Sequence, residues 1–502
     1  MSTVTDHIER RYAKLAAIRE KGYDPYPHKF DLTHSVRQLV ESYSDKSGEE
    51  LEAENISVRT AGRLIAVRGH GKASFGHISG DGARIQIYLR QDRVGEESYE
   101  LYRLLDIGDF IGVTGELART RTGELTVFVD ELFFLSKALL PLPEKWHGLA
   151  DVETRYRQRY LDLIANPEVR EIFVKRSRIV SEIRKFLESR SYIEVETPMM
   201  QVLPGGATAR PFETYHEALG IPLYLRIAPE LYLKRLIVGG FDRVFEVNRN
   251  FRNEGISTQH NPEFTMLEFY QAYSDYFDLM ELTEAMLRSV VKVINGGLEV
   301  EFRGERIDFA RFRRYSMLEA IRFFWDEGPA PSETELGDAE ALAALLDRLA
   351  VKYPDDANWG QLFGMLFEHV VEPKLIQPTF IYDFPVELSP LAKRKKDDVR
   401  FVERFELFAG GLELANAYSE LNDPEEQRKR FEEQLKSRER GDLEAHRMDE
   451  DYIRALQYGM PPTAGEGIGI DRLVMVLTNS SSIREVILFP HLRPIDKGIR
   501  EI

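Results

Sequence analysis

Five short segments between residues 57 and 135 alternate apolar and polar side chains, and this pattern constrains the fold more than any other feature of the sequence. A period of two places successive side chains on opposite faces of a strand, and turn-forming residues separate the segments. A helical stretch at Glu97–Leu105 precedes the fourth segment. Five short strands with one such helix are typical of a small Greek-key barrel of the OB type.

Two prolines and a glycine follow the last segment, in ALLPLPEKWHG, and they predict a domain boundary. A chain of 502 residues is also too long for one ordinary core. We therefore expect an N-terminal helix and OB-type barrel in residues 1–145 and a second domain in residues 146–502. The second domain mixes helical and strand patterns, which predicts an α+β fold, with a helical insertion at about 304–373.

The formal net charge of −17 argues against a nucleic-acid partner, because phosphates would be repelled overall. The charge is uneven, however: Val58–Arg93 contains seven basic and two acidic residues. A local basic surface can bind phosphate because salt screens repulsion beyond about 8–10 Å. A charge cluster alone is as well explained by a solvated strand face.

The sequence contains no cysteine, which excludes disulfides, thiolate catalysis and Cys-ligated metal sites. The histidines have no spacing typical of a zinc site. The first residues lack the apolar run of a signal peptide, and no stretch approaches the roughly 18–20 apolar residues of a membrane span. We expect a cytoplasmic protein with no membrane partner.

The stretch from Arg243 to Tyr270 predicts a pair of strands that place polar side chains on one face. An arginine fork next to an aromatic ring suits a nucleotide, because the guanidinium binds phosphate and the ring stacks on the base. An ordinary polar hairpin would show the same pattern. The residues on this face and in the turn are Glu246, Asn248, Asn250, Arg252, Glu254, His260, Phe264, Met266, Glu268 and Tyr270.

Three longer motifs occur in order along the second domain: RSYIEVETPMM after a long amphipathic helix, FRNEG with HNPEF, and GIGIDRL. Together with PGGATARPF, APELYLKRL and SELNDP, they resemble the class II aminoacyl-tRNA synthetases, specifically the bacterial-type lysyl-tRNA synthetases. The resemblance implies an OB-fold anticodon-binding domain and a catalytic domain built on a mixed, mainly antiparallel sheet flanked by helices. It also implies a homodimer, with the first motif at the interface.

The activity that the resemblance implies is ATP-dependent ligation of L-lysine to tRNA(Lys) through a lysyl-adenylate, with release of pyrophosphate and AMP. Positioning and charge neutralisation would carry the catalysis. Arg252 and Arg472 would be catalytic and, with Glu254, His260 and Phe264, would bind ATP. Mg²⁺ would be the cofactor, held by Glu406 and Glu413, because this hard cation prefers oxygen ligands.

The lysine pocket must offer carboxylates and an apolar wall, because an unpaired buried ammonium group is costly. The resemblance assigns the ε-ammonium contacts to Glu268, Tyr270 and Glu420, and Tyr418 would line the aliphatic stem. It assigns the α-amino group to Glu230 and the Gly206 carbonyl, and the carboxylate to Asn416. A pocket for aspartate would instead need cationic residues at its deep end.

Strand parity presents one difficulty, because Glu413 has the opposite parity to Asn416, Tyr418 and Glu420. If all four lie near one site, the strand needs a β-bulge around Leu414–Ala415. Glu466, in the glycine run AGEGIGIDR, is expected to add a negative charge near the ATP phosphates.

In the barrel, the resemblance assigns anticodon binding to Phe75 and Gln86, assisted by Arg68 and Glu124. An unstacked base offers both its face and its Watson–Crick edge to such residues. Phe75 is alternatively a core residue of the barrel, although Ser74 and Gly76 beside it leave it less enclosed than Ile78.

Three alternatives stay open on the sequence alone. The first is an aspartyl or asparaginyl enzyme, which would share both domains. The second is a synthetase-like factor that lysylates a protein, and the third is a non-catalytic RNA-binding paralogue. Relatives of the second kind generally lack the anticodon barrel. The third is disfavoured by the presence of Arg252, Phe264, Glu406, Glu413 and Arg472 together.

Overall fold

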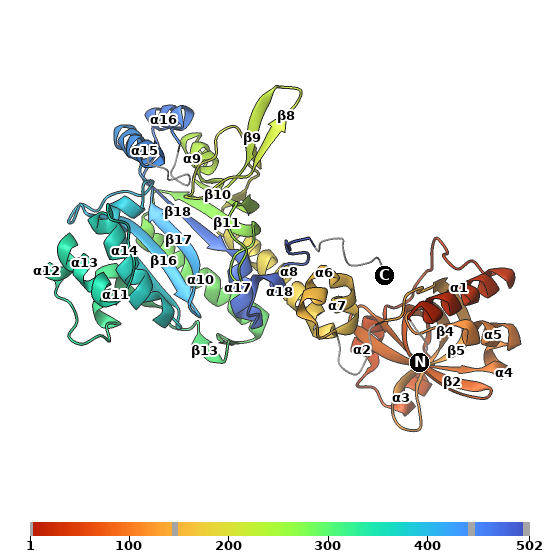
Figure 1. Cartoon of the computed structure of the whole chain (residues 1–502). Coiled ribbons are helices and arrows are strands. Elements are labelled where there is room, and N and C mark those ends of the chain that lie inside the picture. Colours follow the sequence, from red (N-terminus) through yellow and green to blue (C-terminus); the bar gives the residue numbers. More distant parts are fainter. Residues whose placement is uncertain (1–3, 143–148, 440–446, 495–502) are drawn as a thin grey trace. The chain divides into compact units, whose positions relative to one another are not determined.

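The computed structural model describes residues 4–142, 149–439 and 447–494 (Figure 1). The chain forms two compact units, Met1–Arg170 and Glu171–Ile502, each with its own core. The expected domain boundary at residue 145 lies outside the described residues. No helix in the described part of the chain combines the length and apolar composition needed to cross a membrane.

The first unit contains the closed five-stranded barrel that the sequence predicts, with strand order β1-β2-β3-β5-β4. All pairs are antiparallel except β3 with β5. Alternate side chains fill the interior, among them Ile78, Ile85 and Ile87. The strands are β1 (Ser57–His70), β2 (Ala73–Gly80), β3 (Ala83–Arg90), β4 (Phe110–Arg119) and β5 (Leu125–Ser136).

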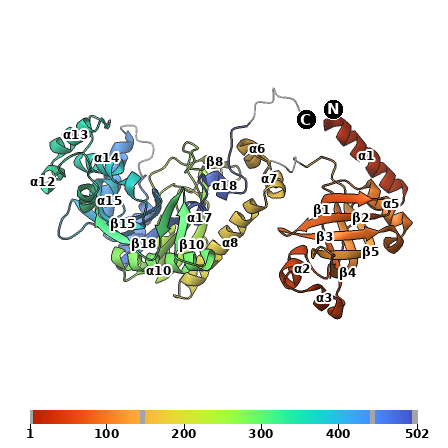
Figure 2. The ribbon, with the colours of Figure 1, turned by 90° about the horizontal axis from the view of Figure 1, so that it is seen from below.

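Five helices accompany the barrel, and Figure 2 shows α1 on one side of it and α2 and α3 on the other. Ser35 and Ser47 begin α2 and α3 with capping boxes, which satisfy the first free N–H groups of each helix. The expected helix before the fourth strand is confirmed as α5. The helices are α1 (Val4–Glu20), α2 (Val36–Tyr43), α3 (Gly48–Glu54), α4 (Gln91–Val94) and α5 (Glu96–Leu104).

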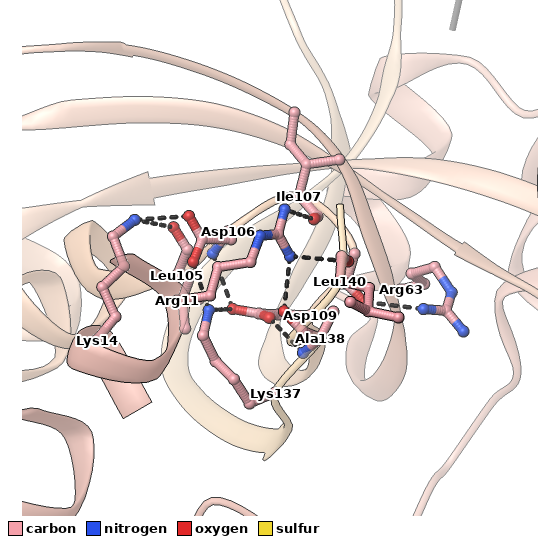
Figure 3. Close-up of polar contacts among 11 residues, drawn as sticks. Arg11, Lys14, Arg63, Leu105, Asp106, Ile107, Asp109, Lys137, Ala138 and Leu140 are labelled. Carbon is pink, nitrogen blue, oxygen red and sulfur yellow. Dashed lines mark hydrogen bonds and ion pairs between the residues drawn. The ribbon is translucent and has the colours of Figure 1, made fainter. Parts of the chain in front are cut away.

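A buried ion network attaches α1 to the barrel (Figure 3). Lys137 Nζ, fully buried, lies 2.6 Å from Asp106 and 2.7 Å from Asp109. Lys14 of α1 reaches the other oxygen of Asp106 at 2.6 Å, and Arg11 donates to the Ala138 carbonyl at 2.6 Å. Burial raises the pKa of Asp106, but the two ammonium groups lower it by more, so the carboxylate is charged.

Two short helices, α6 (Val152–Arg157) and α7 (Arg159–Ala165), precede the long helix α8 (Pro167–Glu188). Apolar side chains of α8 recur at helical spacing and enter the core of the second unit, among them Ile179, Ile183 and Leu187. The predicted amphipathic helix is therefore confirmed. The strand after it is broken into β6 (Ile193–Glu194) and β7 (Met200–Gln201), on either side of Pro198.

The second unit is built on an eight-stranded sheet of order β14-β15-β16-β17-β18-β11-β10-β6. Only the edge pairs β14–β15 and β10–β6 are parallel, which confirms a mixed, mainly antiparallel sheet. The central strands place the functional residues. They are β10 (Arg243–Phe251), β11 (Glu263–Ala272), β15 (Thr379–Pro385), β16 (Phe401–Ala409), β17 (Leu412–Ser419) and β18 (Thr463–Gly469).

One face of this sheet packs on α8, α10 (Tyr276–Asn295) and α17 (Ile470–Thr478) through the largest apolar core. A short hairpin, β12 (Glu299–Phe302) and β13 (Glu305–Asp308), contributes to the same core. The region expected to be a helical insertion from about 304 begins differently. Residues 305–308 and 313–316 are strands, and β14 (Arg313–Ser316) joins the main sheet.

The helical part of that region starts at Met317 and has a core of its own against β15 and β16. It contains α11 (Met317–Phe323), α12 (Glu333–Leu336), α13 (Ala339–Arg348), α14 (Trp359–Val370) and η1 (Glu372–Lys374).

Another layer beside the sheet packs through Leu233, Phe431 and Tyr452. It consists of α9 (Glu230–Val238), α15 (Pro424–Glu439) and α16 (Glu450–Gln457). Near it, β7 pairs with the hairpin β8 (Glu213–His216) and β9 (Ile221–Leu225). The turn η2 (Val386–Leu388) follows β15, and α18 (Ile483–Val486) follows α17.

Substitution of Lys137 by Met is expected to destabilise the barrel by about 3–5 kcal/mol, because two buried carboxylates lose their shared ammonium group. The matched control is Lys21→Met, which breaks an exposed, solvent-screened pair with Glu100 and is expected to change the stability far less. Denaturant titrations monitored by a signal from the barrel measure the free energy of unfolding of both variants. Equal effects of the two substitutions would contradict the role of the network.

Candidate functional site

Alternate glycines of β18 form the floor of the site. Gly465 lies between Tyr270 of β11 and Tyr418 of β17, and Gly467 lies between Glu268 of β11 and Asn416 of β17. A Cβ at Gly465 would overlap the Tyr270 ring and the Glu420 carboxylate, and one at Gly467 would lie 2.8 Å from Met266 Cε. The missing side chains therefore leave room for the polar groups of the neighbouring strands and for a ligand.

Two cavities of about 190 and 270 Å³ lie on this face of the sheet. Arg252, Met266, Asn416 and Gly467 line both, so the cavities adjoin. Among the predicted residues, the first cavity gathers those assigned to ATP, and the second gathers most of those assigned to lysine. The first is lined by Arg252, Glu254, His260, Phe264, Glu413 and Arg472; the second by Gly206, Glu230, Arg252, Glu268, Tyr270, Asn416 and Tyr418.

Cations and an aromatic ring dominate the first cavity. The Arg252 guanidinium lies over the Phe264 ring, 5.1 Å from its centroid. Arg472 Nη1 donates to the Glu413 carbonyl at 2.8 Å and to its carboxylate at 3.1 Å. Two guanidinium groups and an aromatic face suit a ligand that combines phosphates with a base.

His260 accepts at Nε2 from Arg472 Nη2 at 3.2 Å, because an arginine can only donate. Its Nδ1 therefore carries the hydrogen, 3.0 Å from Ser257 Oγ. Burial and the Arg472 charge lower the pKa of His260, so the ring is neutral at physiological pH. A neutral ring adds a polar contact without adding a charge.

The predicted β-bulge is confirmed. In the β16–β17 ladder Leu407 pairs with Ala415 and Phe408 pairs with Glu413, which leaves Leu414 without a partner on β16. The extra residue reverses the parity of the strand, so Glu413 reaches the same face as Asn416.

Two carboxylates meet next to the bulge. Glu406 lies opposite Asn416 in the ladder and pairs with Arg404 Nη2 at 2.5 Å. Burial raises the pKa of Glu406, the carboxylates of Glu413 and Glu372 contribute to the rise and Arg404 opposes it, and the net result is a pKa of about 8. A cation shared with these oxygens would relieve that repulsion, so Glu406 and Glu413 fit a hard metal ion. Within the described residues, no group of three or more His, Asp or Glu side chains is arranged so that it could hold a metal ion.

The second cavity is walled by buried acids. Glu230 and Glu268 are 5% and 4% exposed, and Tyr270 donates to Glu268 Oε2 at 3.5 Å. Burial raises the pKa of Glu268 to about 8, and Glu230 contributes to the rise, whereas Arg252 and Arg226 oppose it. Such a wall favours a ligand that brings its own positive charge.

Glu420 is placed differently from its predicted neighbours. It is 1% exposed and forms an ion pair with Lys234 of α9, which also contacts Glu230 at 2.5 Å. Its Oε1 has no hydrogen-bond donor within the described structure and faces the space above Gly465. The structure thus brings Glu420 to the same cluster, behind the cavity wall.

Glu466 does not add a charge near the phosphate-binding groups, and that expectation is wrong. Because β18 alternates, Gly465 and Gly467 face the cavities, while the Glu466 side chain turns to α10 and accepts from Thr283 Oγ1 at 2.6 Å. Burial raises the pKa of Glu466 well above its ordinary value, so the group is a neutral acid at physiological pH.

Several positioning residues were not predicted from the sequence. Arg404 links the Glu406 carboxylate to Asn416 Oδ1 at 3.1 Å and to Ser389 Oγ at 2.8 Å. Asp471 accepts from the Thr265 N–H at 2.7 Å and from Arg176 of α8 at 2.5 Å, and so joins three elements. The parity of β16 places Arg404 on the face of Glu406, but nothing local indicates the pairing of Lys234 with Glu420 or the partners of Asp471.

On the barrel, Phe75 is 37% exposed and stacks on Tyr88, with ring centroids 4.3 Å apart. It is therefore a surface residue and not part of the barrel core. Gln86 donates to Glu124 Oε2 at 2.7 Å, and His77, opposite Gln86, contacts the other Glu124 oxygen at 2.8 Å. The ladder also brings Arg68 opposite Phe75. The four predicted residues lie on adjacent strands or loops, and Tyr88 and His77 join them.

The basic stretch Val58–Arg93 is less basic at the surface than its sequence indicates. Arg59 stacks between Phe30 and Phe133, and Arg63 stacks on Phe110. Arg90 and Arg93 pair with acids. Among the described residues, no ion pair is formed by Arg68, Lys72 or Arg84, and the first two flank the β1–β2 turn beside Phe75.

Comparison with known proteins matches both units. Residues 151–493 match the family described as class II tRNA synthetases (D, K and N), and residues 58–135 match the OB-fold nucleic acid binding domain. The chain is 56% identical over 487 residues to the lysine–tRNA ligase of Pelotomaculum thermopropionicum, covering 96% of this chain and 94% of that protein. It is 54% identical to the lysine–tRNA ligase of Syntrophomonas wolfei, with 96% of each chain covered, and 53% identical to that of Carboxydothermus hydrogenoformans, with 97% and 98% covered.

Replacement of Glu466 by Gln is expected to remove a pH dependence of stability. The folded-state pKa of Glu466 is raised, so its stabilising contribution is complete below the unfolded value of 4.5 and declines as pH rises toward the folded value. As pH rises above the unfolded value, the variant should gain stability relative to the wild type, by at most about 1.4 kcal/mol per pH unit.

Denaturant titrations at a series of pH values measure this difference. The exposed Glu425→Gln is the matched control and should show a flat difference. A flat difference for Glu466→Gln would mean that the buried group is ionised.

Proposed function

The chain belongs to the class II tRNA synthetases for aspartate, lysine and asparagine, and on this premise we propose that it joins L-lysine to tRNA(Lys) by way of a lysyl-adenylate. The observation that carries the choice of lysine is the group of buried carboxylates at the second cavity: Glu230 and Glu268 line it, and Glu420 lies directly behind its wall. These acids favour a substrate with two ammonium groups. The full-length similarity to lysine–tRNA ligases supports the same substrate.

Aspartate fits this cavity poorly. Its side-chain carboxylate would meet Glu268 and Tyr270, neither of which offers a positive charge, and Lys234 is already shared by two acids. We assign the ε-ammonium group to Glu268, Tyr270 and Glu420, with Tyr418 along the aliphatic stem. Glu230 and the Gly206 carbonyl would hold the α-amino group, and Asn416 the carboxylate.

The two cavities suit an in-line transfer between adjoining substrates. A lysine carboxylate oxygen attacks the α-phosphorus of ATP, the bond from that phosphorus to the bridging oxygen breaks, and pyrophosphate leaves. Arg252 lines both cavities and would hold the α-phosphate and the lysine carboxylate together. The adenine would lie between Phe264 and Arg472, with Glu254 and His260 as further contacts and Arg472 also at the γ-phosphate.

In the second step, a terminal hydroxyl oxygen of the tRNA attacks the lysyl carbonyl carbon and its proton is released to solvent, while AMP leaves with the electron pair of the mixed anhydride bond. We propose that Glu406 and Glu413 hold Mg²⁺, which when bound would neutralise phosphate charge. Because Glu413 also contacts Arg472, the same carboxylate would orient that arginine toward the phosphates.

We propose that the barrel reads the anticodon. Phe75 would stack on a base, since it is exposed and already braced by Tyr88. Gln86 and Glu124 would bind base edges and Arg68 the backbone. The OB-fold match at residues 58–135 supports this and disfavours a factor that lysylates protein. We retain residues 1–145 and 146–502 as the two functional domains.

We also propose a homodimer through the first motif. Apolar side chains from the start of β6 to the residues just after β7 are exposed and together favour burial against a second copy. They are Ile193, Met199, Met200, Val202 and Leu203, exposed by 51%, 46%, 57%, 60% and 41%. We place the protein in the cytoplasm, where its tRNA substrate is found.

Exchange of labelled pyrophosphate into ATP tests the function directly. Exchange should require lysine and should not be supported by aspartate or asparagine. A second assay measures aminoacylation of tRNA(Lys) with lysine. Aspartate-dependent exchange would overturn the choice of substrate, and exchange without tRNA charging would overturn the tRNA assignment.

Substitution of Glu268 by Gln should raise the KM for lysine on the order of a hundredfold while the KM for ATP changes little, because a charged partner of the ammonium group is lost. In the wild type the KM for lysine should fall about tenfold from pH 7 to pH 9. The acid, whose pKa is about 8, must lose its proton to bind the ammonium group.

The variant should show no such fall, because its amide does not titrate. Steady-state exchange at each pH measures both enzymes. Equal increases in the KM values for lysine and ATP would argue against an ε-ammonium role for Glu268.

A further inference from the structure

Lys234 is a fully buried ammonium group at the edge of the lysine pocket. It lies one turn after Glu230 in α9, and its Nζ is 2.5 Å from Glu230 Oε1. It also forms an ion pair with Glu420 Oε2, whose side chain is fully buried as well. Glu230 lines the second cavity and Lys234 does not, so the ammonium group approaches both acids from behind.

The surroundings of Lys234 keep it charged. Burial lowers its pKa, but the carboxylates of Glu230 and Glu420 raise it by more. The Tyr418 ring lies 5.3 Å from its Nζ, and the buried Tyr452 also faces the cluster. Because Glu420 gives Oε2 to Lys234, its Oε1 remains for a ligand, and this oxygen has no hydrogen-bond donor within the described residues.

The charge balance of the pocket depends on this group. Glu230, Glu268 and Glu420 carry three negative charges when ionised, and Lys234 supplies one positive charge through its ion pairs with Glu230 and Glu420. Two negative charges are left, which equals the two ammonium groups of lysine. The lysine carboxylate has its own partner in Arg252, which lines the same cavity.

We propose that Lys234 is a positioning residue that sets the charge of the lysine pocket to match a substrate with two ammonium groups, and that it orients Glu230 and Glu420 from behind. This inference rests on the proposed function, because it specifies how the lysine site of that function is tuned. Without Lys234, the three acids would repel one another in a buried site, and one of them would take up a proton that an arriving ammonium group must displace.

The test compares Lys234→Met, Glu420→Gln and the double variant by lysine-dependent pyrophosphate exchange at pH 7.5. Lys234→Met should raise the KM for lysine about tenfold or more, with the KM for ATP within about twofold. In Glu420→Gln the pocket keeps two acids and Lys234, so its net charge is one negative charge instead of two. The double variant restores two, so it should bind lysine about tenfold more tightly than Glu420→Gln alone.

The comparison of the double variant with Glu420→Gln tests the proposal even if the single variant Lys234→Met does not fold. A double variant that binds lysine no better than Glu420→Gln would overturn the proposal, and so would an unchanged KM for lysine in a folded Lys234→Met. Equal increases in the KM for ATP and for lysine would assign Lys234 a purely structural role. Wild-type protein without any lysine-dependent exchange would overturn the proposed function itself.

Discussion

Carboxylates buried on one face of a sheet are the constraint on which the rest of the catalytic unit depends. A buried charge is tolerated only when a partner and hydrogen bonds compensate its desolvation. Glu246 pairs with Arg226 at 2.7 Å and accepts from Thr197 at 2.7 Å, and Glu406 pairs with Arg404. Each partner lies on the sheet or on a loop beside it, so the ion pairs also fix the geometry of the site.

Glu268 is the exception to this compensation. Within the described structure it has a tyrosine hydroxyl as a neighbour but no ion pair, and its pKa is about 8. A buried acid without an ion-pair partner does not stabilise the fold. It favours binding of a ligand with an ammonium group, because that group supplies the missing partner. The pocket is therefore selective for the charge of its ligand before any contact with the aliphatic stem is made.

Strand parity explains most of the success of sequence reasoning at this site. The even positions of β11 face the cavities as expected, and the bulge at Leu414 was required for Glu413 and Asn416 to share a face. The same parity, applied to β18, places Glu466 away from the cavities, toward α10. This orientation was not predicted from the sequence because no strand was assigned to the glycine run, whereas Thr463–Gly469 is a central strand of the sheet.

By itself the sequence determined the two kinds of domain, the barrel, the strand pairs and the faces of their side chains, because these follow from local periodicity and turn residues. The three ordered motifs indicated the family. Only the tertiary structure decided which charges meet. Lys234 pairs with Glu420, 186 positions later, and Arg176 pairs with Asp471. Ion pairs between distant segments depend on how sheets and helices pack, and no local pattern encodes that packing.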